Sequence, residues 1–297
     1  MKVFIAYPLT DNPTGGGNQF LRCLKKQFVK TGSYDENLQN ADVILYNGHH
    51  EIELVSNLKS KYPNKKFIHR IDGLQKLYNH PNDTRQDIAI EFNKLSNGTV
   101  FQSSWAKSEF KKINFAPKNS TVIHNCVDED IFKPNSKKQL NKKIKLLCTS
   151  WSPNVNKGFS FYKLLDERLD FDRYEFTFIG NKPNNIHYKN IKCLPPKTTQ
   201  EIAKELLYTD IFVSATINDC CSNSIIEALS ARVPVFANNS GGNPELVRDG
   251  GLLFNNVEQF IEDLERLRIN IEFYRKSIKI SNIKQVANDY IEFFKCI

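Results

Sequence analysis

Residues 219–247 read DCCSNSIIEALSARVPVFANNSGGNPELV, and this stretch carries the pattern that decides the fold. A polar loop leads into a helical pattern over residues 224–231, which is followed by the apolar run 233–239 and a turn with two glycines. The run DIFVSAT, just before the loop, is typical of a buried strand. A strand, a helix and a second strand in so short a span predict a parallel βαβ unit.

The same alternation continues on both sides of this stretch. The strand-like runs KVFIAYP, ADVILYN, KKFIHRIDG, GTVFQSS and STVIHNCV alternate with helical segments, and the pattern restarts after the lysine-rich stretch NSKKQLNKK. We therefore expect an α/β fold of two doubly wound Rossmann-like domains facing a central cleft. The expected parts are an N-terminal domain over residues 1–135, a linker over 136–145, a C-terminal domain over 146–280, and a helix over 281–297 that packs back on the N-terminal domain.

Composition narrows the class of protein further. A chain of 297 residues with 40% apolar content is long enough for two cores. The seven cysteines are scattered and odd in number, which favours reduced thiols in a cytoplasmic protein over a disulfide framework. The first apolar run is too short for a secretory signal, and no run is long enough to span a membrane. We expect a soluble cytoplasmic chain, with peripheral membrane contact as the alternative.

The helix that starts near residue 223 is suited to bind an anion. Unpaired backbone N–H groups and the positive end of the helix dipole favour a phosphate at such a helix start. Glu227 lies in the first turns, where its carboxylate would accept hydrogen bonds from the hydroxyls of a ribose beside that phosphate. Ser224 and Glu227 also fit a capping box, in which the glutamate only satisfies a backbone donor, so two interpretations are open.

Asp219 and Glu227 are eight positions apart, and the chain from Glu227 onward reads EALSARVPVFANNSGGNPELVRDGGLLF. This pattern resembles the signature of retaining glycosyltransferases of the GT-B fold, family four. In that family an acidic residue, seven others and a glutamate precede an alanine-rich helix, a Pro-Val strand and a Gly-Gly turn. The resemblance extends over most of the chain and is strongest across residues 205–254. It implies transfer of a sugar from a nucleotide diphosphate-sugar with retention at the anomeric carbon.

The resemblance also implies roles for particular residues. Glu227 would hold the donor ribose, and Asp219, where the family usually has a glutamate, would contact the donor sugar. The turn at residues 239–242 would lie near the same pocket, and Glu245 is either a polar contact or a solvated residue at a helix start. The donor phosphates would bind the backbone of the loop and helix start at Ser222, Asn223, Ser224 and Ile225.

Lys157 and Gly158 resemble the basic residue and glycine that the family places at another helix start. Cleaving a sugar–diphosphate bond leaves negative charge, which a cation and helix-end amides stabilise without a metal. We therefore predict a catalytic role for Lys157, with a solvated lysine as the alternative. Ser152 stands where the family usually has an arginine, so Lys157 would act without that second cation.

In the N-terminal domain, Gly15, Gly16 and Gly17 lie between the first strand and its helix, where backbone can approach a ligand. A tight turn explains these glycines equally well, and the spacing is not that of a dinucleotide-binding motif. The resemblance implies that this loop faces the donor phosphates, which makes Gly16 and Gly17 candidates for donor binding.

The run FIHRIDG ends another strand, and its polar residues would project near the cleft. We predict catalytic roles for Asp72 and His69 and an acceptor-side contact for Arg70, with a core histidine as the alternative for His69. His49 and His50 would bind a metal only if further ligands converged; the sequence reveals none, so we expect adjacent surface histidines, no metal and no cofactor.

The sequence thus predicts a retaining, metal-independent glycosyltransferase that moves a sugar from a nucleotide diphosphate-sugar to a hydroxyl on a glycan, lipid or protein. A nucleotide-sugar-binding protein with decayed catalysis and a nucleotide-sugar epimerase are the alternatives. The formal charge of +8 would suit an anionic membrane surface, although scattered solvated lysines explain it too. No nucleic-acid-binding module is recognisable, so we expect no nucleic-acid partner.

Overall fold

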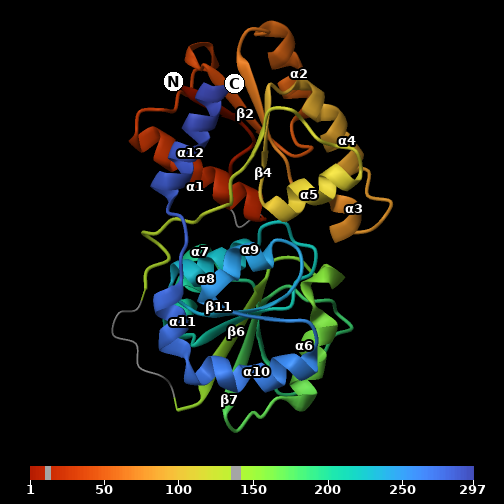
Figure 1. The fold of residues 1–297 in the computed structure, drawn as a ribbon, viewed down its shortest axis with the longest axis vertical. Coiled ribbons are helices and arrows are strands. Elements are labelled where there is room, and N and C mark those ends of the chain that lie inside the picture. The colour runs from red at the N-terminus through yellow and green to blue at the C-terminus, as the bar shows by residue number, and fades with distance from the viewer. Residues whose placement is uncertain (11–14, 135–141) are drawn as a thin grey trace. The chain divides into compact units, whose positions relative to one another are not determined.

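The computed structural model describes residues 1–10, 15–134 and 142–297, and these form two compact units (Figure 1). The first unit comprises Met1–Cys126 and Ser281–Ile297, and the second comprises Val127–Ile280. Residues 136–141 of the expected linker lie outside the described residues, and a strand already begins at Ile144. The division falls earlier than expected because Val127 and Phe132 are buried in the core of the second unit.

The first unit contains a parallel sheet with the strand order β1-β2-β3-β4-β5. On the edge of β1 opposite to β2, the Val3 N–H donates to the Ser33 carbonyl at 2.8 Å, and the Asp35 N–H donates to the Val3 carbonyl at 3.1 Å. The chain therefore pairs on both edges of β1, so the winding reverses between β1 and β2 and creates a topological switch point. The strands are β1 (Val3–Ala6), β2 (Val43–Asn47), β3 (Lys66–Arg70), β4 (Gly98–Phe101) and β5 (Ser120–Val122).

Helices cover both faces of this sheet because its strands alternate apolar side chains to the two sides. Val43 and Leu45 of β2 pack with α1 and α12, whereas Ile44 and Tyr46 pack with α2 and α4. Although α12 comes from the end of the chain, it lies beside α1 (Figure 1). The helices are α1 (Gly16–Lys30), α2 (Ile52–Lys61), α3 (Gln75–Tyr78), α4 (Arg85–Phe92), α5 (Ser104–Lys112) and α12 (Ile283–Cys296), with short 3₁₀ turns at Leu38–Asn40 and Asn93–Leu95.

The second unit contains a parallel sheet with the order β11-β10-β9-β6-β7-β8. The chain runs from β6 outward to β8 and then returns to β9 on the other side of β6, so the switch point lies between β6 and β9. The strands are β6 (Ile144–Ser150), β7 (Tyr174–Gly180), β8 (Lys192–Leu194), β9 (Ile211–Ser214), β10 (Val235–Asn238) and β11 (Gly251–Phe254).

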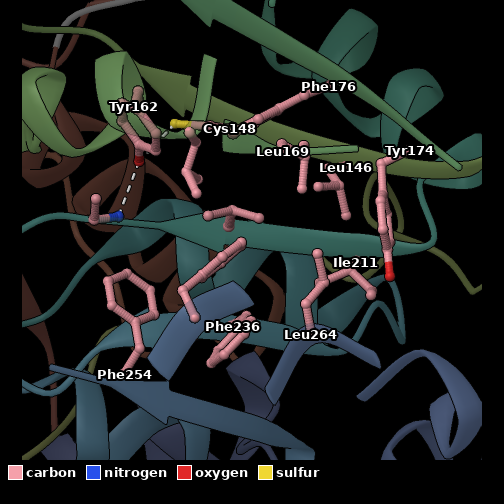
Figure 2. Packing of buried hydrophobic residues seen from close by; sticks show 14 of the residues in the cluster. Leu146, Cys148, Tyr162, Leu169, Tyr174, Phe176, Ile211, Phe236, Phe254 and Leu264 are labelled. Atoms are coloured by element: carbon pink, nitrogen blue, oxygen red, sulfur yellow. Dashed lines mark hydrogen bonds between the residues drawn. The ribbon is translucent and has the colours of Figure 1, made fainter. Parts of the chain in front are cut away.

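An aromatic core fills one face of the second sheet, beneath α6, α10 and α11 (Figure 2). The rings of Phe236 and Phe260 stack with centroids 4.4 Å apart, and the Cys148 thiol donates a hydrogen bond to the Tyr162 hydroxyl at 2.9 Å. The other face packs against α7, α8 and α9. The helices are α6 (Phe159–Arg168), α7 (Thr199–Tyr208), α8 (Asn223–Ser230), α9 (Asn243–Val247), α10 (Val257–Ile269) and α11 (Ile271–Ser277), with 3₁₀ turns η3 (Val155–Lys157) and η4 (Arg248–Gly250).

Across the described ranges, no helix combines enough length with enough apolar character to cross a membrane.

Candidate active site

Lys157 and Asp219 meet at the switch point of the second sheet. Lys157 ends η3, which follows β6, and Asp219 lies in the loop that follows β9. The Lys157 Nζ atom is 3.2 Å from Asp219 Oδ2, and each side chain is 17% exposed. Open parallel α/β sheets bind ligands outside the carboxyl ends of the strands at a switch point, so this ion pair marks the expected ligand position.

The other carboxylate oxygen of Asp219, Oδ1, stabilises the loop that carries this residue. Asp219 Oδ1 accepts a hydrogen bond from the Cys221 amide at 3.1 Å. The Asp219 carbonyl accepts from the Gly242 amide at 2.8 Å. Gly241 has a φ of +63°, and a Cβ at that position would lie 2.3 Å from the Asp219 carbonyl oxygen. Gly241 is therefore explained by its close packing against the loop that carries Asp219.

Gly158 makes a similar close contact on the other side of the switch point. It begins α6 with a φ of +82°, and a Cβ there would lie 2.4 Å from both the Cβ and the carbonyl oxygen of Ala215. This glycine lets the turn after β6 pack directly on the end of β9. Its position beside Lys157 thus has a steric reason that is independent of any ligand.

Helix α8 begins at Asn223, and its N-terminal amides lack a side-chain cap. Ser222 is the N-cap residue, but its hydroxyl lies 3.0 Å from the Ser224 hydroxyl and does not cap the backbone. Within the described part of the chain, no hydrogen bond uses the amides of Ser224 or Ile225. Such amides at a helix start, together with the helix dipole, form an anion-binding site.

Glu227 lies in the second turn of α8, and the capping-box interpretation of this residue is wrong. A capping box requires its serine at the N-cap, whereas Ser224 already lies inside the helix. Among the described residues, the Glu227 carboxylate has no hydrogen-bond or ion-pair partner. Protein surrounds it closely enough that burial raises the pKa of Glu227 to about 8. The carboxyl group is therefore largely protonated near neutral pH, and ligand hydroxyls that donate to it would favour its charged form.

Asn243 anchors the turn after β10, and the sequence analysis did not identify it. Its side chain is fully buried, and Nδ2 donates to the carbonyls of Thr216 and Asn238, both at 3.0 Å. These bonds fix the turn at residues 239–242 against the end of β9. The nearby Glu245 lies in the first turn of α9, which agrees with its expected position at a helix start.

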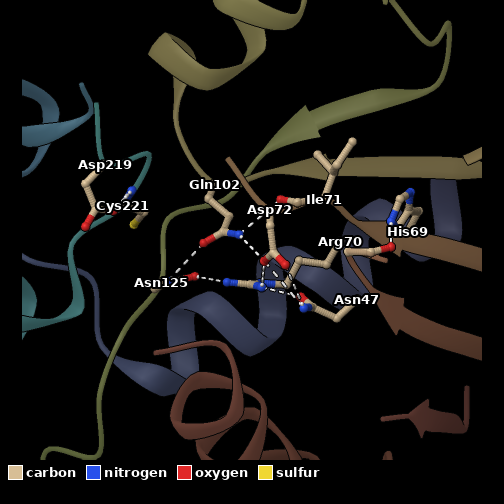
Figure 3. A network of polar contacts seen from close by, with 10 residues as sticks. Asn47, His69, Arg70, Ile71, Asp72, Gln102, Asn125, Asp219 and Cys221 are labelled. Atoms are coloured by element: carbon tan, nitrogen blue, oxygen red, sulfur yellow. Dashed lines mark hydrogen bonds and ion pairs between the residues drawn. The ribbon is translucent and has the colours of Figure 1, made fainter. Parts of the chain in front are cut away.

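In the first unit, Arg70 is the centre of a buried polar network (Figure 3). It ends β3 and has no exposed surface. Its Nη2 donates to Asn125 Oδ1 at 2.7 Å, and its Nη1 donates to Asn47 Oδ1 and, at 3.4 Å, to Asp72 Oδ1. The guanidinium carbon lies 4.7 Å from the centroid of the Phe20 ring. Arg70 is therefore held on several sides inside the core.

Asp72 is the part of this network that reaches the surface. Its side chain is 24% exposed, and its Oδ1 accepts a hydrogen bond from Gln102 Nε2 at 3.1 Å. Asn47 Nδ2 lies 3.3 Å from the other oxygen, Oδ2. Asp72 thus remains accessible to a ligand, whereas Arg70 acts on any ligand only through its neighbours.

His69 lies in the core, which agrees with the alternative interpretation of this residue. It is fully buried and stacks on Tyr46 with ring centroids 4.5 Å apart. Its Nε2 is 2.8 Å from the Gly48 carbonyl, and its Nδ1 is 2.9 Å from Asn93 Nδ2. These partners fit a neutral ring that donates from Nε2 and accepts at Nδ1, and burial lowers the pKa of His69 to about 4. Both ring nitrogens are in use, so His69 has no lone pair for a substrate.

Gly16 and Gly17 form the first turn of α1, after Gly15 as the N-cap residue. A Cβ on Gly17 would lie 3.7 Å from Asn47 Nδ2, which is ordinary contact, and one on Gly15 would meet nothing within 4 Å. Packing among the described residues therefore does not require glycine at these two positions. The residues before them, 11–14, lie outside the described part.

Asn47, Gln102 and Asn125 belong to the network around Asp72, and sequence reasoning missed all three. Asn47 is the last residue of β2, Gln102 follows β4 directly, and Asn125 follows β5 after a short gap. A polar residue at the carboxyl end of each apolar strand was the available signal. A second correction concerns His49 and His50, because Asp72 does converge on them as a third side chain of a type that can ligate a metal.

Comparison with solved structures defines the class of fold. A crystal structure of HepE from Anabaena in complex with UDP matches with a TM-score of 0.76 and 14% sequence identity, covering 100% of both chains. Crystal structures of TarM match with a TM-score of 0.67 and 14% identity, over 93% of this chain and 58% of that one. The two parallel α/β sheets and these matches define a GT-B fold.

The sequence comparisons identify the second unit more closely. Residues 137–270 match the family model described as glycosyl transferases group 1. Glycosyltransferase 1 domain-containing protein 1 of Xenopus tropicalis is 30% identical over 100 residues, which are 33% of this chain and 28% of that relative. The second unit is therefore similar to the glycosyl transferases group 1 over most of its length, in a chain with the GT-B fold.

Proposed function

We propose that this chain is a retaining glycosyltransferase that moves a sugar from UDP-sugar to a hydroxyl group of a glycan, lipid-linked or protein acceptor. The observation that carries the proposal is the arrangement at the second switch point. There the Lys157–Asp219 pair and the uncapped start of α8 follow β6 and β9, the strands that flank this point, and Glu227 lies one helical turn further along.

Each of these groups has a task in breaking the sugar–phosphate bond. The Lys157 ammonium would stabilise the charge that develops on the leaving diphosphate, and the amides of Ser224 and Ile225 would share that charge. The Glu227 carboxylate would accept hydrogen bonds from the two ribose hydroxyls, which favour its charged form and so lower its pKa on binding. Donor binding would thus supply the partners that Glu227 lacks among the described residues.

Asp219 has a different task from the one that the family resemblance implies. Its Oδ2 is engaged by Lys157 and its Oδ1 by the Cys221 amide. We propose that Asp219 positions Lys157 and shapes the phosphate loop, and that direct contact with the donor sugar is secondary. The shorter side chain of aspartate, compared with glutamate, fits this role because it keeps the carboxylate close to its own loop.

The choice of uridine rests on structural neighbours. HepE was crystallised with UDP, with UDP-glucose, and with UDP and glucose, and a TarM variant was crystallised with UDP. Because these proteins share the fold at 14–15% identity, they support uridine as the first base to test. The sugar would react with an acceptor hydroxyl on the face that the diphosphate leaves, and the diphosphate would take the hydroxyl proton.

On the acceptor side we propose Asp72 as the contacting residue. Arg70 and His69 would position it, because both are buried and neither presents a free nitrogen to solvent. Gly16 and Gly17 would let a ligand approach the backbone at the start of α1. The seven free cysteines agree with a reducing compartment, so we place the reaction in the cytoplasm, with an anionic membrane surface as the source of a lipid-linked acceptor.

The experiment is a thermal-shift screen with UDP, GDP, ADP, dTDP and CMP, on the wild type and on Glu227→Ala. We expect stabilisation by UDP alone, lost in the variant, because ligand binding to the folded state raises the melting temperature. Incubation with UDP-sugars and product analysis then separates transfer from epimerisation. Binding without turnover of any donor would favour the decayed-catalysis alternative, and no shift with any nucleotide would contradict the proposal.

A further inference from the structure

Three metal-binding side chains meet at the carboxyl edge of the first sheet. One ligand atom from each of His49, His50 and Asp72 lies within 4.8 Å of the other two. Asn47 and Arg70 are register partners at the ends of β2 and β3. His49 and Asp72 each lie two residues further along, so the register of the strands brings them to the same level. The pairing of β2 with β3 therefore places these side chains close together.

Gly48 allows the carboxylate to approach the two histidines. It has a φ of +55°, and a Cβ at this position would lie 2.3 Å from Asp72 Oδ2 and 3.1 Å from its Cγ. The Gly48 carbonyl accepts from His69 Nε2 at 2.8 Å, and its amide donates to the Arg70 carbonyl at 2.9 Å. The turn that carries His49 is thus fixed on both sides of the glycine, with Asp72 against it.

The hydrogen bonds of Asp72 leave one oxygen for a ligand. Oδ1 accepts from Gln102 at 3.1 Å and from Arg70 and Asn47 at 3.4 Å each. Among the described residues, the one hydrogen bond to Oδ2 comes from Asn47 Nδ2, at 3.3 Å. Oδ2 is also the oxygen that faces Gly48. Metal-binding carboxylates are commonly oriented by such hydrogen bonds on their other oxygen.

The histidines supply nitrogen atoms that the protein itself does not use. His49 Nδ1 is buried and has no hydrogen-bond partner among the described residues. The ring centroids of His49 and His50 lie 4.2 Å apart with an angle of 32° between the ring planes, so the two rings pack against each other. The His50 ring also packs edge-on against Tyr7 at 5.2 Å. A buried nitrogen without a partner is costly, and a metal ion would remove that cost.

We propose that His49, His50 and Asp72 bind one divalent transition-metal ion, with Zn²⁺ as the best fit. Two imidazoles and one carboxylate are ligands that Zn²⁺ accepts, and three protein ligands leave a fourth position for water or a substrate oxygen. Arg70 shares the charge of Asp72, so the ligand set is poor in negative oxygen and disfavours Mg²⁺ and Ca²⁺. The proposal concerns metal binding alone; it shares Asp72 with the proposed acceptor contact, but its test measures bound metal and not sugar transfer.

The test is a titration of the tag-free full chain with Co²⁺, followed by displacement with Zn²⁺. Co²⁺ replaces Zn²⁺ in such sites, and its absorption spectrum separates nitrogen and oxygen ligands from thiolates, which matters because this chain has free cysteines. We expect one equivalent to bind without a thiolate band. His49→Ala and His50→Ala should each weaken binding at least tenfold, and Gln102→Ala, which removes a hydrogen bond that orients Asp72, about tenfold. The control is His187→Ala, at an exposed histidine of the second unit.

The proposal would be overturned by any of three results. These are no binding to the wild type, equal binding to the wild type and to both histidine variants, or a thiolate band that accounts for all bound Co²⁺. Circular dichroism of each variant shows whether it is folded. If His49→Ala unfolds, Gly48→Ala serves as the second variant, because its Cβ would displace the Asp72 carboxylate and should weaken binding in the same direction.

Discussion

The two sheets present contrasting polar groups at their carboxyl edges. In the first unit, Arg70 is fully buried and has hydrogen bonds to side chains that follow three different strands. In the second, the Lys157–Asp219 pair is partly exposed, the start of α8 lacks a side-chain cap, and Glu227 has no partner within the described ranges. At the first edge the buried guanidinium is held by side chains of the protein itself, and Asp72 with the neighbouring histidines is what a ligand could reach; the second edge leaves the start of α8 and Glu227 for a ligand.

The difference separates structural from functional polar residues. A buried charge that has several partners cannot be removed without leaving those partners unsatisfied, so its loss should appear mainly in stability. A partly exposed ion pair contributes little to stability, so its loss should appear mainly in activity. Both edges lie at switch points, which means that position in the fold alone would not distinguish them.

Removal of the buried guanidinium should have the largest effect. We expect Arg70→Ala to lower the free energy of unfolding by about 3–5 kcal/mol, because Asp72, Asn47 and Asn125 lose their shared donor and a cavity opens. Urea denaturation measures the change. Lys94→Ala is the matched control, since Lys94 and its partner Glu91 are each 71% exposed, and it should stay within about 0.5 kcal/mol of the wild type. Similar losses of unfolding free energy in Arg70→Ala and Lys94→Ala would mean that the buried guanidinium matters no more for stability than an exposed lysine.

Lys157 should give the opposite result. We expect Lys157→Ala to lower kcat for sugar transfer by about 10²–10³-fold, the usual loss for a group that stabilises developing charge, while stability changes by less than about 1 kcal/mol. Steady-state kinetics and urea denaturation on the same preparations test both parts. Lys111→Ala, an exposed lysine of the first unit, should leave both quantities unchanged. A stability loss that accounts for the lost activity would argue against a catalytic role.

Asp219 allows its two possible roles to be separated. If it positions Lys157, Asp219→Ala should weaken the binding of UDP, which carries no sugar, about tenfold. The effects of Asp219→Ala and Lys157→Ala should then be non-additive, with a coupling of about 1–2 kcal/mol. Calorimetric titration of UDP into the wild type, both single variants and the double variant gives this coupling. Additive effects, with UDP affinity unchanged in Asp219→Ala, would indicate a contact with the sugar instead.

The smallest effect concerns the pH dependence of stability. Burial raises the pKa of Glu227 from 4.5 to about 8, so the folded state holds this proton more tightly than the unfolded state. Below pH 4.5 both states are protonated; as the pH rises towards 8 the unfolded state loses its proton first, and stability falls. Glu227→Gln stays neutral at every pH. The free energy by which this variant is more stable to unfolding than the wild type should therefore grow across this window, by about 1–2 kcal/mol after allowance for partial exposure.

Thermal melts at pH 5 and pH 8.5 measure this difference. Glu262→Gln, at an exposed position on α10, is the control and should show no such trend. UDP should narrow the gap between Glu227→Gln and the wild type at pH 8.5, because ribose hydroxyls stabilise the carboxylate. A difference between variant and wild type that does not change with pH would mean that the Glu227 carboxyl is not destabilised in the folded protein.

Much of the fold was predictable because its signals are local. The strands β1 to β4 and β9 to β11 are short apolar runs with turn residues at their ends, and α8 follows from the spacing of Ile225, Ile226 and Leu229. The group 1 signature was also visible, since it lies within one continuous segment. The boundary between the units was placed too late, because the burial of Val127 and Phe132 depends on residues distant in sequence.

The candidate sites were only partly predictable. Lys157, Asp219 and Glu227 were found from their places in the sequence, but the contact between Lys157 and Asp219 joins positions that are 62 residues apart. Sequence reasoning identified Arg70 and Asp72 without their partners, because Asn47, Gln102 and Asn125 come from other strands. It also overlooked Asp72 as a third ligand beside His49 and His50, since only the pairing of β2 with β3 brings them together.

The sequence by itself determined the alternation of strands and helices, the resemblance to family-four glycosyltransferases and the residue types available for phosphate and ribose. These depend on periodicity and on motifs within short segments. Tertiary structure decided which polar groups are saturated and which are left for a ligand. Burial and hydrogen-bond partners are set by the register of strands and by the packing of helices, which bring together residues that no local pattern connects.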